Sequence, residues 1–181
     1  MSAASLLLYP DPRLRHVAEP VTAFDASLRQ SVADLEAVMQ AVSALGLTLP
    51  HIGLLQRVVV LRMEPGAPTT IYVNPQIVWT SDERGPQTEG SVSMPGIMET
   101  VDRAARVRVR FSDLSGVEHE EEAEGFRAAC LQHEVDQLDG IFWIDRLSRL
   151  RRDRALKRFA KLRRVAGWHS EDSRVSDPYP P

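Results

Sequence analysis

The sequence of 181 residues contains a single cysteine, Cys130. One cysteine excludes an intrachain disulfide and a zinc-finger scaffold, because both need several cysteines. No stretch of about 18 apolar residues is present, so no membrane-spanning helix is expected. The first residues also lack the basic and apolar segments of a secretory signal. These absences, together with 43% hydrophobic and 26% charged residues, predict a globular protein of the cytoplasm that has no contact with a membrane.

The length and the composition along the chain indicate one domain followed by a short tail. A chain of this size can bury a core without disulfides or a structural metal. We expect the domain to span residues 1–166. Residues 167–181 are polar and end in proline, so they are predicted to form a flexible C-terminal tail. The sequence does not indicate an oligomeric state.

The charge is unevenly distributed. The net charge is −3, but residues 149–164 hold nine basic residues against Asp153 alone, a net +8 that leaves −11 for the remainder. A basic segment on an acidic body is a candidate contact for a polyanion. The alternative is a solvated helix face without a partner.

Hydrophobic periodicity predicts helices over about 26–43, over 125–138 and over the basic segment. Asp25 and Ser148 precede the first and third of these as N-caps. Strands are expected at 58–61, 71–73 and 107–111, with the glutamate-rich 118–124 as a wet strand edge. Strands predominate between the first two helices, so the predicted fold class is α+β. The inward-facing residues expected in the third helix are Leu150, Leu156, Phe159 and Leu162.

The middle helix carries His133-Glu134-Val135-Asp136-Gln137. In metallohydrolases a His-Glu pair with a second histidine at the i+4 position places two imidazoles on one helix face, and the glutamate acts as general base. Here the i+4 position is Gln137, whose neutral amide is a poor ligand for zinc or ferrous iron. Taken alone, the pair is also compatible with an ordinary polar helix face.

Several separated motifs together resemble the peptide deformylase family, in the expected order over about residues 6–165. They are Tyr9 to Arg15, Asn74-Pro75, Glu89-Gly90-Ser91-Val92-Ser93-Met94-Pro95-Gly96, Val101-Asp102-Arg103 and Cys130 to Gly140. The resemblance implies antiparallel sheets around a central helix with the His-Glu motif, plus a C-terminal helix. It also implies removal of the formyl group from the N-terminal methionine of new polypeptides.

The same resemblance implies a site with Fe²⁺ or Zn²⁺ held by one cysteine and two histidines. In this family a glutamate shuttles the proton, while a glutamine side chain and the backbone N–H after the cysteine stabilise the oxyanion. This chain has Ser91 in place of the cysteine, Gln137 in place of the second histidine and His51 in place of the glutamine. Only His133 remains as a metal ligand, so we expect no metal cofactor.

Three hypotheses follow. In the first, Ser91, His133, His51 and Glu134 converge with the Val92 N–H in a metal-independent reaction on a formyl or amide substrate. In the second, His51, His133 and a carboxylate, from Glu134 or Glu89, form a rebuilt site for Fe²⁺ or Zn²⁺. In the third, the domain is a non-catalytic relative that binds a peptide, or contacts ribosomal RNA through the basic helix 149–164.

The predicted ligand is a small-molecule or peptide amide. Arg103 matches an arginine that, by resemblance, contacts the substrate backbone, and the alternative is a salt bridge to the glutamate-rich edge. A pocket suited to an apolar side chain is expected beside it. Besides Arg103, the residues predicted to bind the substrate or to line this pocket are Leu45, Gly46, Glu89, Gly90, Val92, Ala129 and Cys130.

Overall fold

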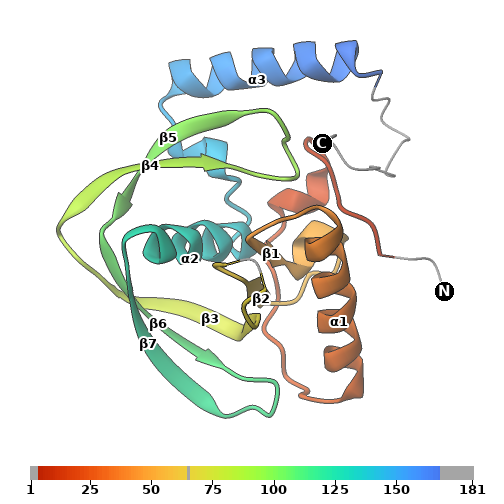
Figure 1. The fold of residues 1–181 in the computed structure, drawn as a ribbon, viewed down its shortest axis with the longest axis vertical. Coiled ribbons are helices and arrows are strands. Elements are labelled where there is room, and N and C mark those ends of the chain that lie inside the picture. The colour runs from red at the N-terminus through yellow and green to blue at the C-terminus, as the bar shows by residue number, and fades with distance from the viewer. Residues whose placement is uncertain (1–3, 65, 168–181) are drawn as a thin grey trace.

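The computed structural model describes residues 4–64 and 66–167. Figure 1 shows these residues as two sheets on either side of a central helix, with two further helices outside them. The α-helices are α1 (Ala26–Ala41), α2 (Gly125–Leu138) and α3 (Arg149–Val165). Short 3₁₀ segments occur at Pro12–Arg15, Leu49–Ile52 and Trp143–Arg146. No helix among the described residues is both long and apolar enough to span a membrane.

All strand pairs in the two sheets are antiparallel. The larger sheet has the order β1 (Gly46–Thr48), β2 (Val58–Leu61), β3 (Thr70–Thr80), β6 (Arg106–Ser112) and β7 (Glu118–Glu124). The smaller sheet is the hairpin of β4 (Arg84–Gly90) and β5 (Met98–Ala104). This architecture confirms the predicted α+β class, and β7 is the solvated edge that its glutamates indicate.

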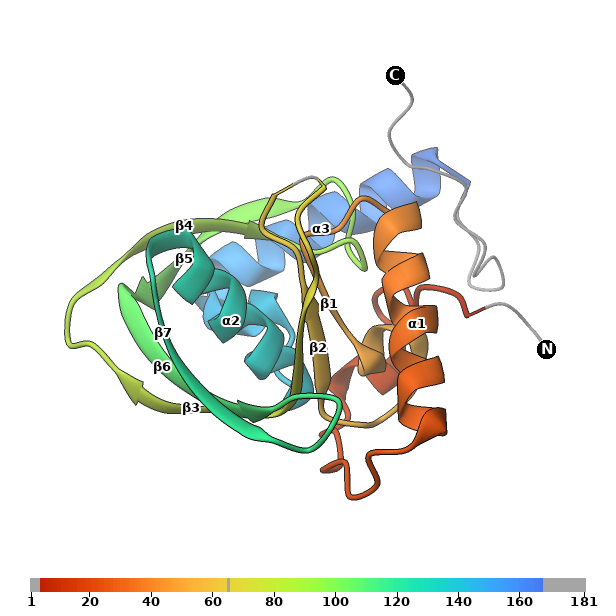
Figure 2. The same cartoon turned by 60° about the horizontal axis from the view of Figure 1, so that its bottom comes forward.

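The central helix is α2, which lies between the β4–β5 hairpin and the larger sheet in both views (Figures 1 and 2). Its predicted apolar stripe, which includes Leu131 and Leu138, is buried. Its polar face is buried as well, including Gln132, Glu134 and Gln137. A buried polar side chain needs a hydrogen-bond partner, and Gln132 finds two in the backbone N–H and C=O of Ala104.

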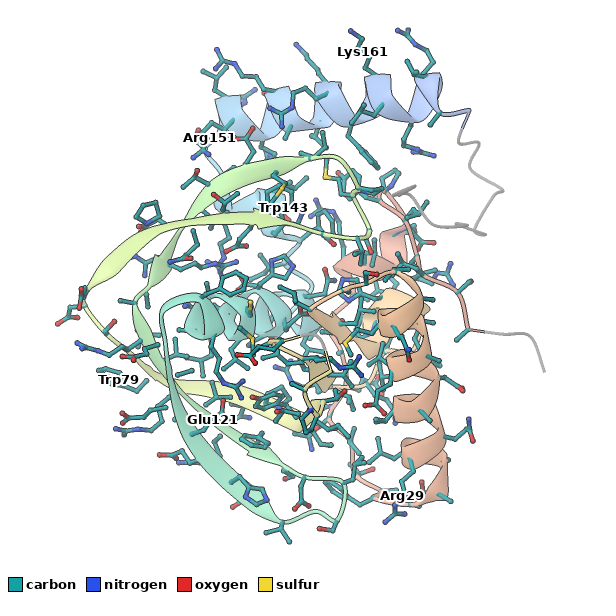
Figure 3. All side chains as sticks on the ribbon, in the orientation of Figure 1. Arg29, Trp79, Glu121, Trp143, Arg151 and Lys161 are labelled. Carbon is teal, nitrogen blue, oxygen red and sulfur yellow. The ribbon has the colours of Figure 1, made fainter. Side chains whose placement is uncertain are left out.

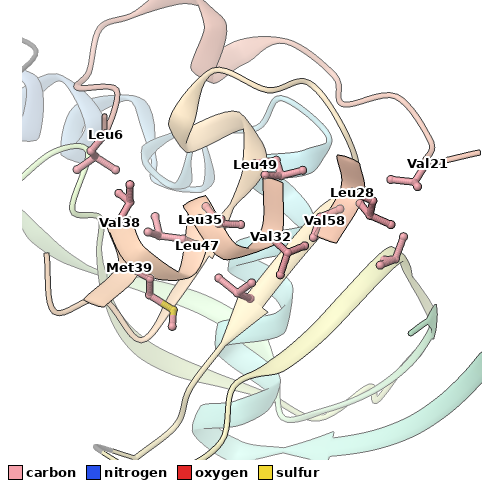
Figure 4. Close-up of a cluster of buried hydrophobic side chains, with 12 residues drawn as sticks. Leu6, Val21, Leu28, Val32, Leu35, Val38, Met39, Leu47, Leu49 and Val58 are labelled. Atoms are coloured by element: carbon pink, nitrogen blue, oxygen red, sulfur yellow. The ribbon is translucent and has the colours of Figure 1, made fainter. Parts of the chain in front are cut away.

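Helix α1 closes one side of the molecule. The Asp25 side chain accepts hydrogen bonds from the backbone N–H groups of Ser27 and Leu28, so the predicted N-cap is confirmed. The helix ends at Ala41, two residues before the predicted end, because Ser43 takes a left-handed backbone conformation. Its apolar face packs on β1 and β2 in the cluster of Figure 4. Leu47 of β1 belongs to this cluster, and the neighbouring Gly46 lines the cavity described below.

Helix α3 lies along the β4–β5 hairpin, and Lys161 projects from its outer face (Figure 3). Phe159 is buried as the pattern predicts and Leu156 is partly buried, but Leu150 is 60% exposed and Leu162 is 42% exposed. Ala155, which the pattern did not include, is buried as well. The expectation that Leu150 faces inward is wrong, whereas Leu162 is only partly covered and its Cδ1 atom lies close to Gly96. Leu150 precedes Ala155 by five residues, which turns it about 140° away from the buried face. Ser148 occupies the N-cap position without a side-chain hydrogen bond to the helix.

The predicted flexible tail, residues 167–181, lies outside the described residues except for Gly167.

Candidate functional site

A cavity of about 390 Å³ opens between β1, the first turns of α2 and the loop that joins β4 to β5. This volume is within the range of small-molecule pockets. Of the twelve predicted site residues, all except Arg103 line it. They are Leu45, Gly46, His51, Glu89, Gly90, Ser91, Val92, Ala129, Cys130, His133 and Glu134.

Gly46 allows α2 and β1 to approach each other at the floor of the cavity. A Cβ atom at this position would lie 2.5 Å from Oε1 of Glu134 and 3.1 Å from Cδ1 of Leu61. These distances are too short for any larger residue unless Glu134 moves. The absence of a side chain at Gly46 therefore makes the room that the Glu134 carboxyl occupies.

The carboxyl group of Glu134 is buried, and one of its oxygen atoms has no hydrogen-bond partner among the described residues. The residue is 6% exposed, and its Oε2 atom is buried with no hydrogen-bond partner. Burial disfavours the charged carboxylate and, despite the opposing effect of His133, raises the pKa of Glu134 to about 7. A carboxyl group with this pKa can both accept and donate a proton near neutral pH.

His133 is oriented by a charged partner on β4. Its Nδ1 atom lies 2.9 Å from Oε2 of Glu89. Burial is the largest effect and would lower the pKa of His133, but the hydrogen bond to Glu89 and the negative charges of Glu134 and Glu89 together outweigh burial, and the pKa is raised. Burial opposes ionisation of Glu89, but the hydrogen bonds from Arg103 and His133 lower the pKa of Glu89 to about 2. His133 therefore donates from Nδ1 to a carboxylate, and its Nε2 is directed away from that bond.

Arg103 contradicts the expectation that it contacts a substrate. It is 4% exposed, and its Nε and Nη2 atoms donate to Glu89 at 2.6 and 2.9 Å. Its Nη1 atom donates to Asp136 of α2 at 2.6 Å, and Asp136 also pairs with Arg146. The alternative of an ion pair is correct in kind, but the partners are not the glutamates of β7. The sequence shows the charge of Arg103 without showing which face of β5 it occupies.

His51 is held from one side by Thr48. Both the backbone N and the Oγ1 of Thr48 approach the Nδ1 atom of His51, at 3.1 and 2.8 Å. The ring is buried, and burial, followed by the proximity of His133, lowers the pKa of His51 to about 3. His51 is therefore a neutral group in the wall of the cavity.

Ser91 is not paired with a base. Its Oγ atom accepts a hydrogen bond from the backbone N–H of Ser93 at 3.1 Å. Within the described part of the chain, no hydrogen bond joins Ser91 to His51, His133 or Glu134. A serine nucleophile normally needs such a base within hydrogen-bond distance.

Gln137 turns away from the cavity. It is buried, and its Nε2 donates to the backbone carbonyl of Leu14 at 2.6 Å. Gln137 is not among the cavity-lining residues, although it follows His133 by one helical turn. Across residues 4–64 and 66–167, no group of three or more His, Cys, Asp or Glu side chains is placed to hold a metal ion.

A family model described as Polypeptide deformylase matches residues 3–153. The chain belongs to the peptide deformylase family. A protein from Brucella melitensis named "Peptide deformylase-like" is 54% identical over 164 residues, which cover 91% of this chain and all of the relative. A "Peptide deformylase" from a Bradyrhizobium species is 41% identical, over 92% of this chain and 99% of the relative. The crystal structure of a peptide deformylase from Legionella pneumophila superimposes with a TM-score of 0.86 at 35% identity, over 93% of this chain and 99% of that one.

Membership of the peptide deformylase family allows the substituted positions to be compared with the metal ligands of the family. The three positions at which the resemblance places metal ligands hold Ser91, His133 and Gln137 here. One is a neutral hydroxyl, one is an imidazole and one is an amide bonded to Leu14. This donor set does not fit a centre built from one thiolate and two imidazoles.

Several apolar residues at the cavity were not predicted from the sequence, among them Met98 and Phe126. Met98 begins β5 and is 61% exposed, and Phe126 is the second residue of α2 and is half-exposed. Both line the cavity together with Leu6 and Ile97. Phe126 lies off the apolar stripe of its helix, which is the one signal in the sequence that it has a role other than core packing.

Proposed function

We propose that this member of the peptide deformylase family hydrolyses the amide bond of a small N-formyl or N-acyl substrate without the metal centre of the family. The observation that carries the proposal is the Glu134 carboxyl, which is buried in an apolar cavity with an unpartnered Oε2 atom. A buried acceptor without a partner is expected to be satisfied by a ligand or a bound water.

Glu134 is the proton-transfer group in this proposal. It takes a proton from a water molecule as the water oxygen attacks the substrate carbonyl carbon, and it returns the proton to the nitrogen as the C–N bond breaks. A pKa of about 7 suits both steps. No change of charge on another protein group is needed to balance the reaction.

The developing charge on the carbonyl oxygen needs hydrogen-bond donors. His133 and His51 line the same cavity as Glu134, and so does Val92. The Val92 N–H makes no hydrogen bond to another described residue. Donors of this kind, placed before the reaction, stabilise an oxyanion more than they stabilise the starting carbonyl.

The loss of the metal centre rests on what the substituted side chains contact. Ser91 is a weak, neutral ligand, and the side-chain amide of Gln137 donates to the backbone carbonyl of Leu14. The rebuilt alternative with His51, His133 and Glu134 would hold Fe²⁺ or Zn²⁺, but Nδ1 of His51 accepts a hydrogen bond from the Thr48 N–H, which leaves the proton of the neutral ring on Nε2. We therefore propose that no metal cofactor is used.

The cavity wall favours an apolar group next to the acyl carbonyl. Met98, Phe126 and Leu45 line its sides. Burial raises the pKa of the Cys130 thiol to about 12, so the thiol stays neutral and belongs to this wall. An amide with one apolar side chain fits this environment.

The test is hydrolysis of a panel of N-formyl and N-acyl amino acids by protein whose metal content is measured by mass spectrometry. We expect turnover that persists after treatment with a chelator and is lost in Glu134→Gln. The exposed Glu118→Gln on β7 is the matched control and should keep full activity. Loss of turnover on chelation, or about one metal ion per chain, would refute the proposal.

Binding without turnover is the second candidate. The Ser91 hydroxyl has no base, so the site contains no activated side-chain nucleophile. A ligand that raises the melting temperature through preferential binding to the folded state, with no product formed, would favour this candidate.

We also propose that α3 contacts RNA, as the basic segment 149–164 indicates. Arg151 and Arg158 pair with Glu99 of β5, so the body of the protein already engages part of the helix. Lys161 projects from its outer face (Figure 3). Binding to ribosomes that weakens as salt increases, and that is lost in Lys161→Glu, would support this contact.

A further inference from the structure

The hydrogen bonds to His51 determine where its proton resides. A backbone N–H can only donate, so the contact at 3.1 Å requires the Nδ1 atom of His51 to accept. The Thr48 hydroxyl, 2.8 Å from the same atom, then donates as well. A neutral imidazole carries one proton, which leaves it on Nε2.

Thr48 and His51 are both fixed by their surroundings. Thr48 ends β1, is fully buried and pairs with Val59 in the sheet. The 3₁₀ segment that follows carries His51, and the backbone carbonyl of His51 accepts a hydrogen bond from the N–H of Leu7 at 2.7 Å. The ring therefore cannot exchange its Nδ1 contacts without disturbing the end of a core strand.

We propose that Thr48 is a positioning residue that fixes His51 as the Nε2–H tautomer, so that His51 offers the cavity one donor and no acceptor. This inference rests on the proposed function for the identity of the ligand, and it names the ligand class more closely. The group that meets His51 is a carbonyl or carboxylate oxygen, which can accept, and not an amine or ammonium.

The fixed tautomer removes two other roles for His51. A general base for Ser91 needs a free lone pair, and the only lone pair of this ring is occupied by Thr48. A metal ligand that binds through Nε2 needs the proton on Nδ1, which would set this N–H against the backbone N–H of Thr48 and break that hydrogen bond. His51 thus supplies a donor at the position where, by resemblance, the family has a glutamine.

The direct test is a long-range ¹H–¹⁵N correlation spectrum of the full-length protein with ¹⁵N-labelled histidine rings. The signals of His51 are assigned by their absence in His51→Gln. We expect the Nε2–H pattern in the wild-type protein and in Thr48→Ser, and a partial shift to the other tautomer in Thr48→Val. An Nδ1–H pattern or a doubly protonated ring at pH 7 would overturn the inference.

Binding of N-formylmethionine and of sodium formate tests the donor itself. His51→Phe keeps a ring without a donor and should weaken binding of both probes by about tenfold or more. His51→Gln keeps an N–H donor and should bind both probes within about threefold of the wild type. Equal affinity in His51→Phe and the wild type would overturn the inference.

These readouts separate the inference from the proposed function. The tautomer is measured on the unliganded wild-type protein, so it does not depend on turnover or on the folding of a variant. The Nε2–H pattern and bound probes without hydrolysis would refute the proposed reaction alone. The Nδ1–H pattern would refute the role of Thr48 even in an active enzyme.

Discussion

The buried carboxyl group of Glu134 lowers the stability of the folded protein at neutral pH. Its pKa is about 7 in the folded protein against an ordinary value of 4.5. Between these values the unfolded chain releases the proton while the folded protein retains it. Stability is therefore lost as the pH rises through this window, by about 3 kcal/mol from this residue.

Glu134→Gln removes this pH-dependent loss. We expect the free energy of unfolding of the variant, relative to that of the wild type, to be higher at pH 8 than at pH 5, as measured by urea denaturation. Glu118→Gln, at an exposed position, should show no such gain. If the difference between Glu134→Gln and the wild type is the same at both pH values, the carboxyl is not held protonated by burial.

Gly46 is the residue that makes room for this carboxyl. Gly46→Ala places a Cβ atom 2.5 Å from Oε1 of Glu134, so the side chain or β1 must shift. We expect a loss of about 1–3 kcal/mol in the free energy of unfolding, together with loss of turnover. The control is Gly85→Ala in β4, where an added Cβ meets nothing within 4 Å. Equal stability of the two variants would show that Glu134 has space to move.

At the scale of elements, the β4–β5 hairpin is joined to α2 through buried charges. Arg103 of β5 pairs with Glu89 of β4 and Asp136 of α2, and all three are buried. Glu89 in turn orients His133 at the cavity. Through Glu89, Arg103 outside the cavity therefore helps to position His133 inside it.

Arg103→Met removes the guanidinium that the two buried carboxylates share, and it leaves Glu89 with His133 and Asp136 with Arg146. Breaking a buried pair in this way costs about 3–5 kcal/mol, which denaturant unfolding at pH 7 can measure. Arg84→Met removes an exposed pair with Asp102 on the same hairpin, and it should cost less than about 1 kcal/mol. A small loss for Arg103→Met would mean that water replaces the guanidinium.

Local sequence patterns predicted the three α-helices and four of the seven strands that the structure describes, but they did not predict β1, β4 or β5. Periodicity located the helices to within two residues, and the alternation in β6 and the glutamates of β7 predicted a solvated edge. The sequence pattern could not show that Arg103 is buried, because the burial of a strand residue depends on which other element packs over it. The hydrogen-bond partners of His51 and Gln137 could not be predicted either, because they depend on the path of the backbone at Thr48 and Leu14.

At the scale of the whole molecule, the fold is that of a peptide deformylase, while three positions that the resemblance assigns to the site carry other residues. The TM-score of 0.86 to a peptide deformylase structure extends over 93% of the chain. The changed positions lie on three separate elements, namely the loop after β4, α2 and the 3₁₀ segment after β1. Gln137 also ties α2 to the N-terminal segment through Leu14. A centre of one thiolate and two imidazoles would therefore require new donors on two elements and the release of one contact between elements.

Ser91→Cys combined with Gln137→His tests whether the scaffold still places three metal donors together. We expect the double variant to bind about one Zn²⁺ per chain in competition with a chelator, because His133 is already oriented by Glu89. Each single variant supplies only two donors and should bind more weakly by about tenfold or more. The bond from Gln137 to Leu14 is lost in the double variant, so its metal-free form should be less stable than the wild type. If the double variant binds no more metal than the single ones, the backbone around α2 has moved beyond the substituted side chains.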